Sequence, residues 1–205
     1  MRSGPIGRPP VAPRDVPRLF VAIPIPTDIA ARIGELVADV QTALGPAGQR
    51  VRWIQMEGLH VTLRFLGPTP KSQIQAVASA VERSARRSGP FELRVGGAGA
   101  FPDPVRPRAL WVGIRSGAAE LGQLSSALTE ALVADGWALE DRAFRPHMTI
   151  ARTDGVHAGA EAGSLLVARS AELDLGFTAD HVVLYRSHLG HGPARYEILH
   201  SVPLG

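Results

Sequence analysis

The chain has 205 residues, of which 45% are hydrophobic and 20% are charged. These proportions are typical of a globular protein and exclude a chain that is disordered throughout. It contains no cysteine, which excludes a disulfide framework, a zinc ribbon and a thiol nucleophile, and which fits a reducing cytoplasm. No apolar run reaches the roughly 18–20 residues that cross a bilayer, so we expect no membrane span and a cytoplasmic location.

The formal net charge is only +3 although the sequence pI is about 10.1. Lys71 is the only lysine and there are two tyrosines, so few groups titrate between histidine and arginine. The high pI therefore does not indicate a broad basic surface of the kind that coats long nucleic acids. A short or small anionic substrate agrees better with this charge, and nothing in the sequence implies a protein partner, so we expect a monomer.

The first 17 residues include five prolines and no apolar segment, which predicts a poorly ordered tail. From residue 18 onward, hydrophobic periodicity predicts alternating strands and helices. Strands are expected at residues 19–23, 51–54, 59–66 and 91–95. Helices are expected from residue 27 or 28 to the Gly45-Pro46 stop and at residues 71–87. Residues 96–107, rich in glycine and proline, are expected to form a loop.

The pattern then begins again, because residues 110–114 resemble residues 19–23 at an offset of 91. A helix at 118–134, a strand at 146–152 and a second helix at 156–169 follow. A last strand pair is expected at 182–186 and 195–202, joined by a turn at 190–193. This repetition predicts an internal duplication with two similar lobes, at residues 18–107 and 108–205, that face each other across a cleft.

A His-x-Thr motif occurs once in each repeat, as His60-Val61-Thr62-Leu63 and as His147-Met148-Thr149-Ile150. Both copies lie in predicted strands, and their offset of 87 nearly equals that of the opening strands. Side chains at i and i+2 of a strand point to the same face, so each histidine is expected beside its threonine. The intervening Val61 and Met148 are expected to point into the core.

If the lobes face each other, two imidazoles and two hydroxyl groups converge on one cleft. Such a set suits displacement at phosphorus: one histidine accepts a proton from the attacking water and the other gives one to the leaving oxygen. The threonine hydroxyls donate to the phosphate oxygens, where charge accumulates. The alternative for any single motif is a histidine whose hydrogen bonds are satisfied within its strand, but the duplication favours catalysis.

Three further residues are candidates for substrate contact. Arg64 shares the face of Thr62 by strand parity, whereas Arg152 has the wrong parity relative to His147 unless its strand bulges. Phe101 lies in the expected loop, where an aromatic ring is free to stack on a base. No residue set with sensible spacing predicts a metal site, and neither a dinucleotide-binding nor a Walker sequence is present, so we expect no cofactor.

The two motifs resemble those of the 2H phosphoesterases, and in particular the RNA 2′,3′-cyclic 3′-phosphodiesterases, also called 2′-5′ RNA ligases. The resemblance runs from about residue 18 to the end and includes residues 60–67, 144–152 and 184–189. It implies a bilobal α+β fold with an antiparallel sheet in each lobe, flanked by helices. It also implies hydrolysis of RNA 2′,3′-cyclic phosphate ends to 2′-phosphates, with His60 as proton donor and His147 as proton acceptor.

Other functions remain open from the sequence. Some members of the family also join tRNA halves through a 2′-5′ bond. The same two motifs would serve a phosphodiesterase that acts on a small cyclic nucleotide or on a 2′-5′ oligonucleotide. A non-catalytic RNA-binding module would keep the cleft without the chemistry, but the presence of both histidines argues against it.

Overall fold

The computed structural model describes residues 16–140, 142–155, 158–188 and 194–205. Apart from Pro17, which is buried and whose carbonyl accepts a hydrogen bond from the Thr69 amide at 2.8 Å, and Val16, the predicted tail lies outside these residues. The first repeat contains these elements in chain order: β1 (Arg18–Pro24), α1 (Thr27–Leu44), β2 (Arg52–Trp53), β3 (His60–Pro68), α2 (Ile74–Ala85) and β4 (Phe91–Phe101). Short 3₁₀ turns occupy Gly45–Arg50, Met56–Gly58 and Lys71–Gln73.

The second repeat contains a similar series of elements and ends with three strands. In chain order these are β5 (Ala109–Ser116), α3 (Ala118–Ala134), β6 (His147–Arg152), α4 (Gly159–Arg169), β7 (Leu175–Ala179), β8 (His181–His188) and β9 (Arg195–Pro203). The predicted helix at 118–134 has these bounds in the structure. The start expected for the helix at 156–169 and the whole turn expected at 190–193 fall outside the described residues.

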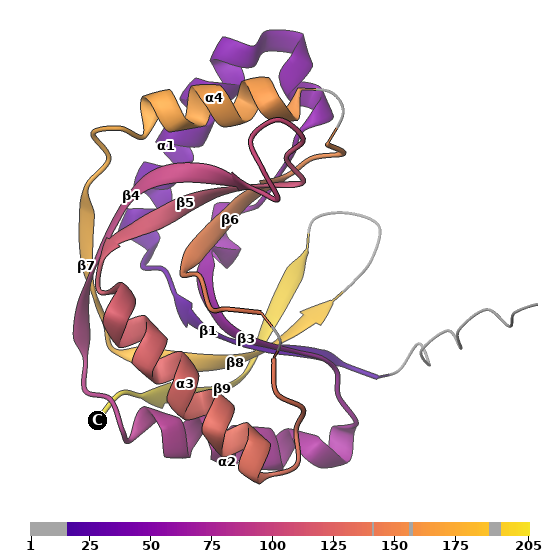
Figure 1. Cartoon of the computed structure of the whole chain (residues 1–205), viewed down its shortest axis with the longest axis vertical. Helices are drawn as coiled ribbons and strands as arrows, with labels where there is room; N and C mark the ends of the chain where they lie inside the picture. Colours follow the sequence, from indigo (N-terminus) through magenta and orange to yellow (C-terminus); the bar gives the residue numbers. More distant parts are fainter. Residues whose placement is uncertain (1–15, 141, 156–157, 189–193) are drawn as a thin grey trace, which may run out of the picture.

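The strands form two antiparallel sheets, with the orders β3-β1-β8-β9 and β2-β6-β5-β4-β7 (Figure 1). Helices α2 and α3 lie together against the four-stranded sheet, and α1 and α4 against the five-stranded sheet. This confirms the predicted α+β fold with two antiparallel sheets flanked by helices.

The sheets do not follow the two halves of the sequence, however. Strand β4, from the first half, pairs with β5, and strands β8 and β9, from the second half, extend the sheet that begins with β1. The boundary expected near residue 107 therefore does not separate the two sheets. Strands β2 and β4 of the first repeat thus lie in the sheet of β5 and β6, and β8 and β9 of the second repeat lie in the sheet of β1 and β3, so the two lobes are interleaved.

One expectation for the middle of the chain is wrong, and one strand nearer its end was missed. The glycine-rich segment after residue 95 is not a loop from its start, because β4 continues to Phe101. The register with β5 shifts between Val95 and Ala98, and Gly97 adopts a positive φ of 69° there. Further on, Gly99 lies under the indole ring of Trp111, where a Cβ would clash. Strand β7 was not expected at all.

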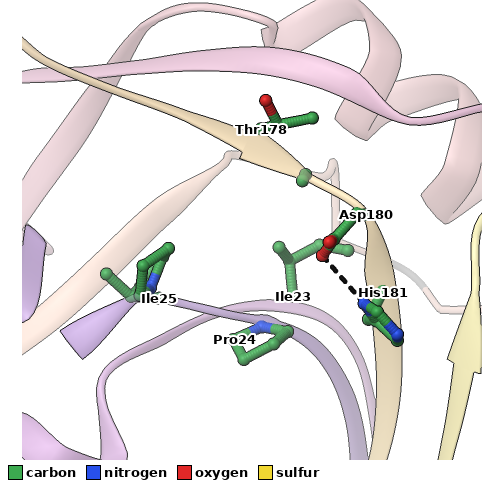
Figure 2. A pocket seen from close by; sticks show the side chains of 8 residues that line it. Ile23, Pro24, Ile25, Thr178, Asp180 and His181 are labelled. Carbon is green, nitrogen blue, oxygen red and sulfur yellow. Dashed lines mark hydrogen bonds and ion pairs between the residues drawn. The ribbon is translucent and has the colours of Figure 1, made fainter. Parts of the chain in front are cut away.

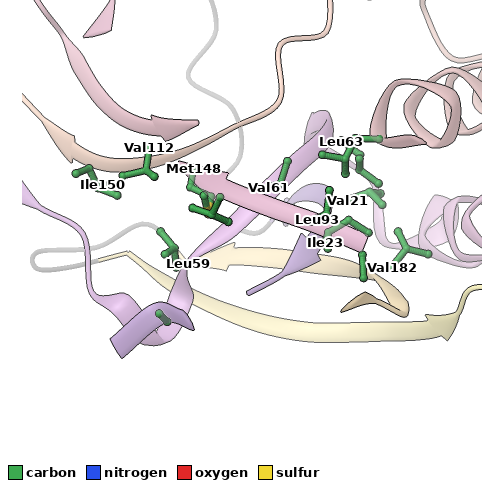
Figure 3. Packing of buried hydrophobic residues seen from close by; sticks show 14 of the residues in the cluster. Val21, Ile23, Leu59, Val61, Leu63, Leu93, Val112, Met148, Ile150 and Val182 are labelled. Atoms are coloured by element: carbon green, nitrogen blue, oxygen red, sulfur yellow. The ribbon is translucent and has the colours of Figure 1, made fainter. Parts of the chain in front are cut away.

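One continuous cluster of buried hydrophobic side chains lies between the sheets and the helices (Figure 3). Val61 and Met148, the residues between each histidine and threonine, are both 0% exposed, which confirms their predicted direction. The helices bury residues spaced three or four apart, such as Leu121, Leu124 and Leu128 of α3, as an amphipathic helix requires. The core thus fixes which face of β3 and β6 carries polar side chains.

The core position of Leu93 on β4 allows a test of this packing. Leu93 is 0% exposed, so Leu93→Ala should lower the free energy of unfolding by about 2–5 kcal/mol in urea titrations, because it leaves a cavity. Val105→Ala, at a position 75% exposed, is the control and should change it by less than about 0.5 kcal/mol. Equal losses in the two variants would contradict the described position of β4.

Candidate active site

Each motif histidine is held by the same backbone contact. The Nδ1 atom of His60 lies 2.6 Å from the carbonyl oxygen of Gly58, and that of His147 lies 2.6 Å from the carbonyl oxygen of Arg145. A carbonyl oxygen only accepts, so each Nδ1 must carry the hydrogen. The other ring nitrogen, Nε2, is then left to accept a proton in the neutral imidazole or to donate one in the imidazolium.

The two motif strands share an irregularity that the sequence did not reveal. In β3, Ala22 pairs with Thr62 and Val21 with Arg64, so Leu63 is an extra residue. In β6, Trp111 pairs with Thr149 and Leu110 with Ala151, so Ile150 is the extra one. These are β-bulges at equivalent positions. The first six residues of each strand have the same burial pattern, in which the fourth and fifth residues are both buried.

The bulge decides which arginine shares the face of the histidines. Beyond it, parity reverses, so Arg152 lies on the side of His147 and Thr149, and its equivalent in β3 is Phe65. Arg64, which simple parity placed beside Thr62, lies on the opposite face and is 6% exposed. Its Nη2 donates to the Ala138 carbonyl at 2.5 Å and its Nη1 is 3.2 Å from Glu140. The parity argument for substrate contact by Arg64 is therefore wrong.

Aromatic rings surround both imidazoles. On the four-stranded sheet, the His60 ring is 4.8 Å from Phe20 and meets Tyr196 edge-on at 5.2 Å, while Tyr185 stacks on Phe20 at 5.1 Å. The Tyr196 ring also lies against Gly58, where a Cβ would be 2.9 Å from it. The absence of a side chain at Gly58 thus leaves room for the Tyr196 ring, and the Gly58 carbonyl holds His60.

On the other sheet, Phe101 meets His147 edge-on at 4.9 Å, and Trp111 lies 5.4 Å from Phe101. The structure therefore brings Phe101 to the candidate site, although from a strand and not from a loop. The contribution of Phe20 and the two tyrosines was missed because aromatic residues in apolar strands are usually core residues. One feature of the sequence could have indicated this contribution: the only two tyrosines of the chain lie in its last two strands.

Electrostatics connect the two sheets at this site. Burial lowers the pKa of His60 below its usual 6.5, and the charge of His147 lowers it further, against the Gly58 contact, which raises it. Burial also lowers the pKa of His147, with a further lowering by Arg152. Arg152 on β6 likewise lowers the pKa of Tyr196 on β9, although burial raises that pKa overall. The two histidines, Arg152 and Tyr196 therefore act on one another across the sheets.

A different hollow, shown in Figure 2, lies where β1 ends beside the junction of β7 and β8. Its lining includes Ile23, Ile25 and Thr178, and His181 there binds its neighbour Asp180 at 2.8 Å. Neither motif histidine lines it. Among the described residues, no three histidine or acidic side chains gather as a metal site would need, and no helix has the length and hydropathy to cross a membrane.

Comparison with known proteins agrees with this geometry. The family model of the 2′-5′ RNA ligase superfamily matches residues 20–191. The chain belongs to this superfamily. The match confirms the resemblance to the 2H phosphoesterases that the two motifs indicate.

Curated relatives carry the name RNA 2′,3′-cyclic phosphodiesterase. The protein of Geobacillus stearothermophilus is 31% identical over 90% of this chain, which spans 56% of that protein's length. The Aeropyrum pernix protein is 35% identical over 60% of this chain and 68% of its own length. The Bacillus subtilis protein is 27% identical over 89% of this chain and 94% of its own length.

Solved structures have the same fold. A structure described as a phosphoesterase superposes with a TM-score of 0.73 at 26% identity, covering 93% of this chain and 99% of that one. E. coli LigT complexed with 3′-AMP gives a TM-score of 0.70 at 25% identity, with the same coverage. The interleaved arrangement of the two sheets is therefore the architecture of known phosphoesterases.

The lowered histidine pKa values predict a pH dependence of stability. Below pH 6.5 the unfolded chain binds protons that His60 and His147 in the folded chain do not take up, so both destabilise the fold as the pH falls. The variant His60→Gln removes one such group. The difference in unfolding free energy, variant minus wild type, should therefore increase as the pH is lowered from 8 to 5, as measured by urea titration. A relative stability that falls over that interval would mean that the His60 pKa is raised.

Proposed function

We propose that this protein hydrolyses RNA 2′,3′-cyclic phosphate ends to 2′-phosphates. The observation that carries the proposal is the paired backbone contact, which holds an imidazole on each of the two neighbouring strands β3 and β6 and leaves both Nε2 atoms for proton transfer. The names of the relatives support the substrate class. Because both histidines come from one chain, we also propose that a single copy is sufficient for activity.

In the proposed step, the Nε2 of His147 accepts a proton from water while the water oxygen bonds to phosphorus. The bond from phosphorus to O3′ breaks, and the Nε2 of His60 donates its proton to O3′. The products are a 3′-hydroxyl and a 2′-phosphate, so atoms and charge balance. The hydroxyls of Thr62 and Thr149 donate to the non-bridging oxygens, which gain charge in the transition state.

The resemblance to the family assigns His60 as the acid and His147 as the base, and one of the charges near the rings favours the same assignment. Arg152 disfavours the protonated form of His147, which suits a proton acceptor. His60 must be protonated to donate, yet burial lowers its pKa in the free protein. A bound phosphodiester brings a negative charge next to the ring and favours the imidazolium, so substrate binding itself prepares the acid.

The direct test uses a short RNA that ends in a 2′,3′-cyclic phosphate. Wild type should release only the 2′-phosphate, with EDTA present, since side chains supply every group in the step. His60→Ala and His147→Ala should each lower kcat by about 10²–10⁴, and Thr62→Val or Thr149→Val by about 10–10³. A 3′-phosphate product, or activity that needs one divalent metal, would contradict the proposed step.

The two histidine roles are separable by the leaving group. A nitrophenyl phosphodiester has a leaving group that needs no proton, so it should restore much of the rate to His60→Ala but not to His147→Ala. The comparison is the ratio of kcat/KM for this substrate to that for the cyclic phosphate in each variant. Restoration of His147→Ala alone would show that the acid and the base are reversed.

A further inference from the structure

Two arginines lie directly opposite each other at the edge of the five-stranded sheet. Arg52 on β2 pairs in register with Arg152 on β6, and the next pair along is Trp53 with Ala151. Ala151 is fully buried and Trp53 packs on the core, so both arginines extend from the other face, where they are exposed. Because of the bulge in β6, this face is the one that carries His147 and Thr149.

The two charges are not neutralised within the part of the chain that the structure describes. Like charges directly opposite on adjacent strands repel each other and destabilise the pair. Other arginines of this chain have acidic partners: Arg87 lies 2.7 Å from Glu130, and Arg94 lies 2.5 Å from Asp174. Neither Arg52 nor Arg152 forms an ion pair with any described carboxylate. An anion bound between them would relieve the repulsion.

Of the two arginines, Arg152 lies beside the candidate active site and Arg52 lies farther from it. The charge of Arg152 reaches His147 and Tyr196, whereas Arg52 stands one strand farther out, about 4.8 Å across the sheet. A cyclic phosphate carries a single negative charge, for which Arg152 and the two threonines provide enough donors. Arg52 therefore has its guanidinium available for a second anionic group next to the first.

We infer that Arg52, next to Arg152, forms a subsite for a second phosphate of the substrate. This inference rests on the proposed function and narrows its substrate class. The preferred substrate is then an RNA end whose terminal nucleotide carries a 5′-phosphate or phosphodiester as well as the cyclic phosphate. An isolated nucleoside 2′,3′-cyclic phosphate would leave Arg52 without a partner.

The test compares adenosine 2′,3′-cyclic phosphate with the same compound phosphorylated on O5′. Wild type should show a kcat/KM about tenfold higher for the phosphorylated compound, and Arg52→Gln should reduce this ratio towards one. Arg52→Lys, which keeps the charge but loses the planar fork, should keep part of the preference. The control Arg32→Gln removes the same charge from α1, where Arg32 pairs with Glu35, and should leave the ratio unchanged.

A binding measurement separates this inference from the proposed function. Adenosine 2′,5′-bisphosphate and adenosine 2′-monophosphate are titrated into wild type and Arg52→Gln by calorimetry, without any reaction. Tighter binding of the bisphosphate to wild type, lost in Arg52→Gln, supports the subsite even if no cyclic phosphate is hydrolysed. Equal affinities in wild type, or a preference that Arg52→Gln retains, would overturn the subsite. The proposed hydrolysis is tested separately by the assay with the cyclic-phosphate RNA.

Discussion

The hydrogen bond from each histidine Nδ1 to the carbonyl two residues before it is the contact on which the candidate site depends. It fixes the tautomer, and it fixes the direction in which Nε2 points. It requires that the chain turn into β3 and β6 with the same geometry, which the duplicated strands supply. Without this carbonyl, neither ring nitrogen would be favoured to carry the hydrogen, and the tautomer would not be fixed.

The two motif strands share the same bulge, but the side chains around them differ. After each bulge, the residue that returns to the histidine face is Phe65 in β3 and Arg152 in β6. Both histidines have aromatic neighbours, Tyr196 beside His60 and Phe101 beside His147, but the charge of Arg152 acts on His147. We propose that this difference distinguishes the proton acceptor from the proton donor, which two equivalent imidazoles could not do.

Much of the fold was predictable because it depends on local periodicity. The apolar spacing of α1 and α3 and the alternation around both His-x-Thr motifs gave the correct elements and the correct buried residues, such as Val61 and Met148. Periodicity says which face of an element is apolar, but not which element covers it. The exchange of β4 and β8 between the sheets therefore had no signal in the sequence.

The errors at the site have local physical causes. The bulges at Leu63 and Ile150 leave no mark in the hydrophobic pattern, because the extra residue is itself apolar, and each reverses the parity used to compare Arg64 with Arg152. The glycines of β4 suggested a loop, whereas Gly99 makes room for the Trp111 ring. The sequence did not indicate Arg52 as a site residue, because its proximity to Arg152 arises only from the pairing of β2 with β6, one hundred residues apart.

The tautomers of His60 and His147 test the central claim most directly. Long-range ¹⁵N–¹H correlation spectra of the ¹⁵N-labelled protein at pH 8, assigned with His60→Gln and His147→Gln, separate a protonated ring nitrogen from an unprotonated one. The account predicts that both rings carry their hydrogen on Nδ1 and leave Nε2 unprotonated, because each Nδ1 faces a carbonyl oxygen. A ring with its hydrogen on Nε2 in either motif would contradict the account.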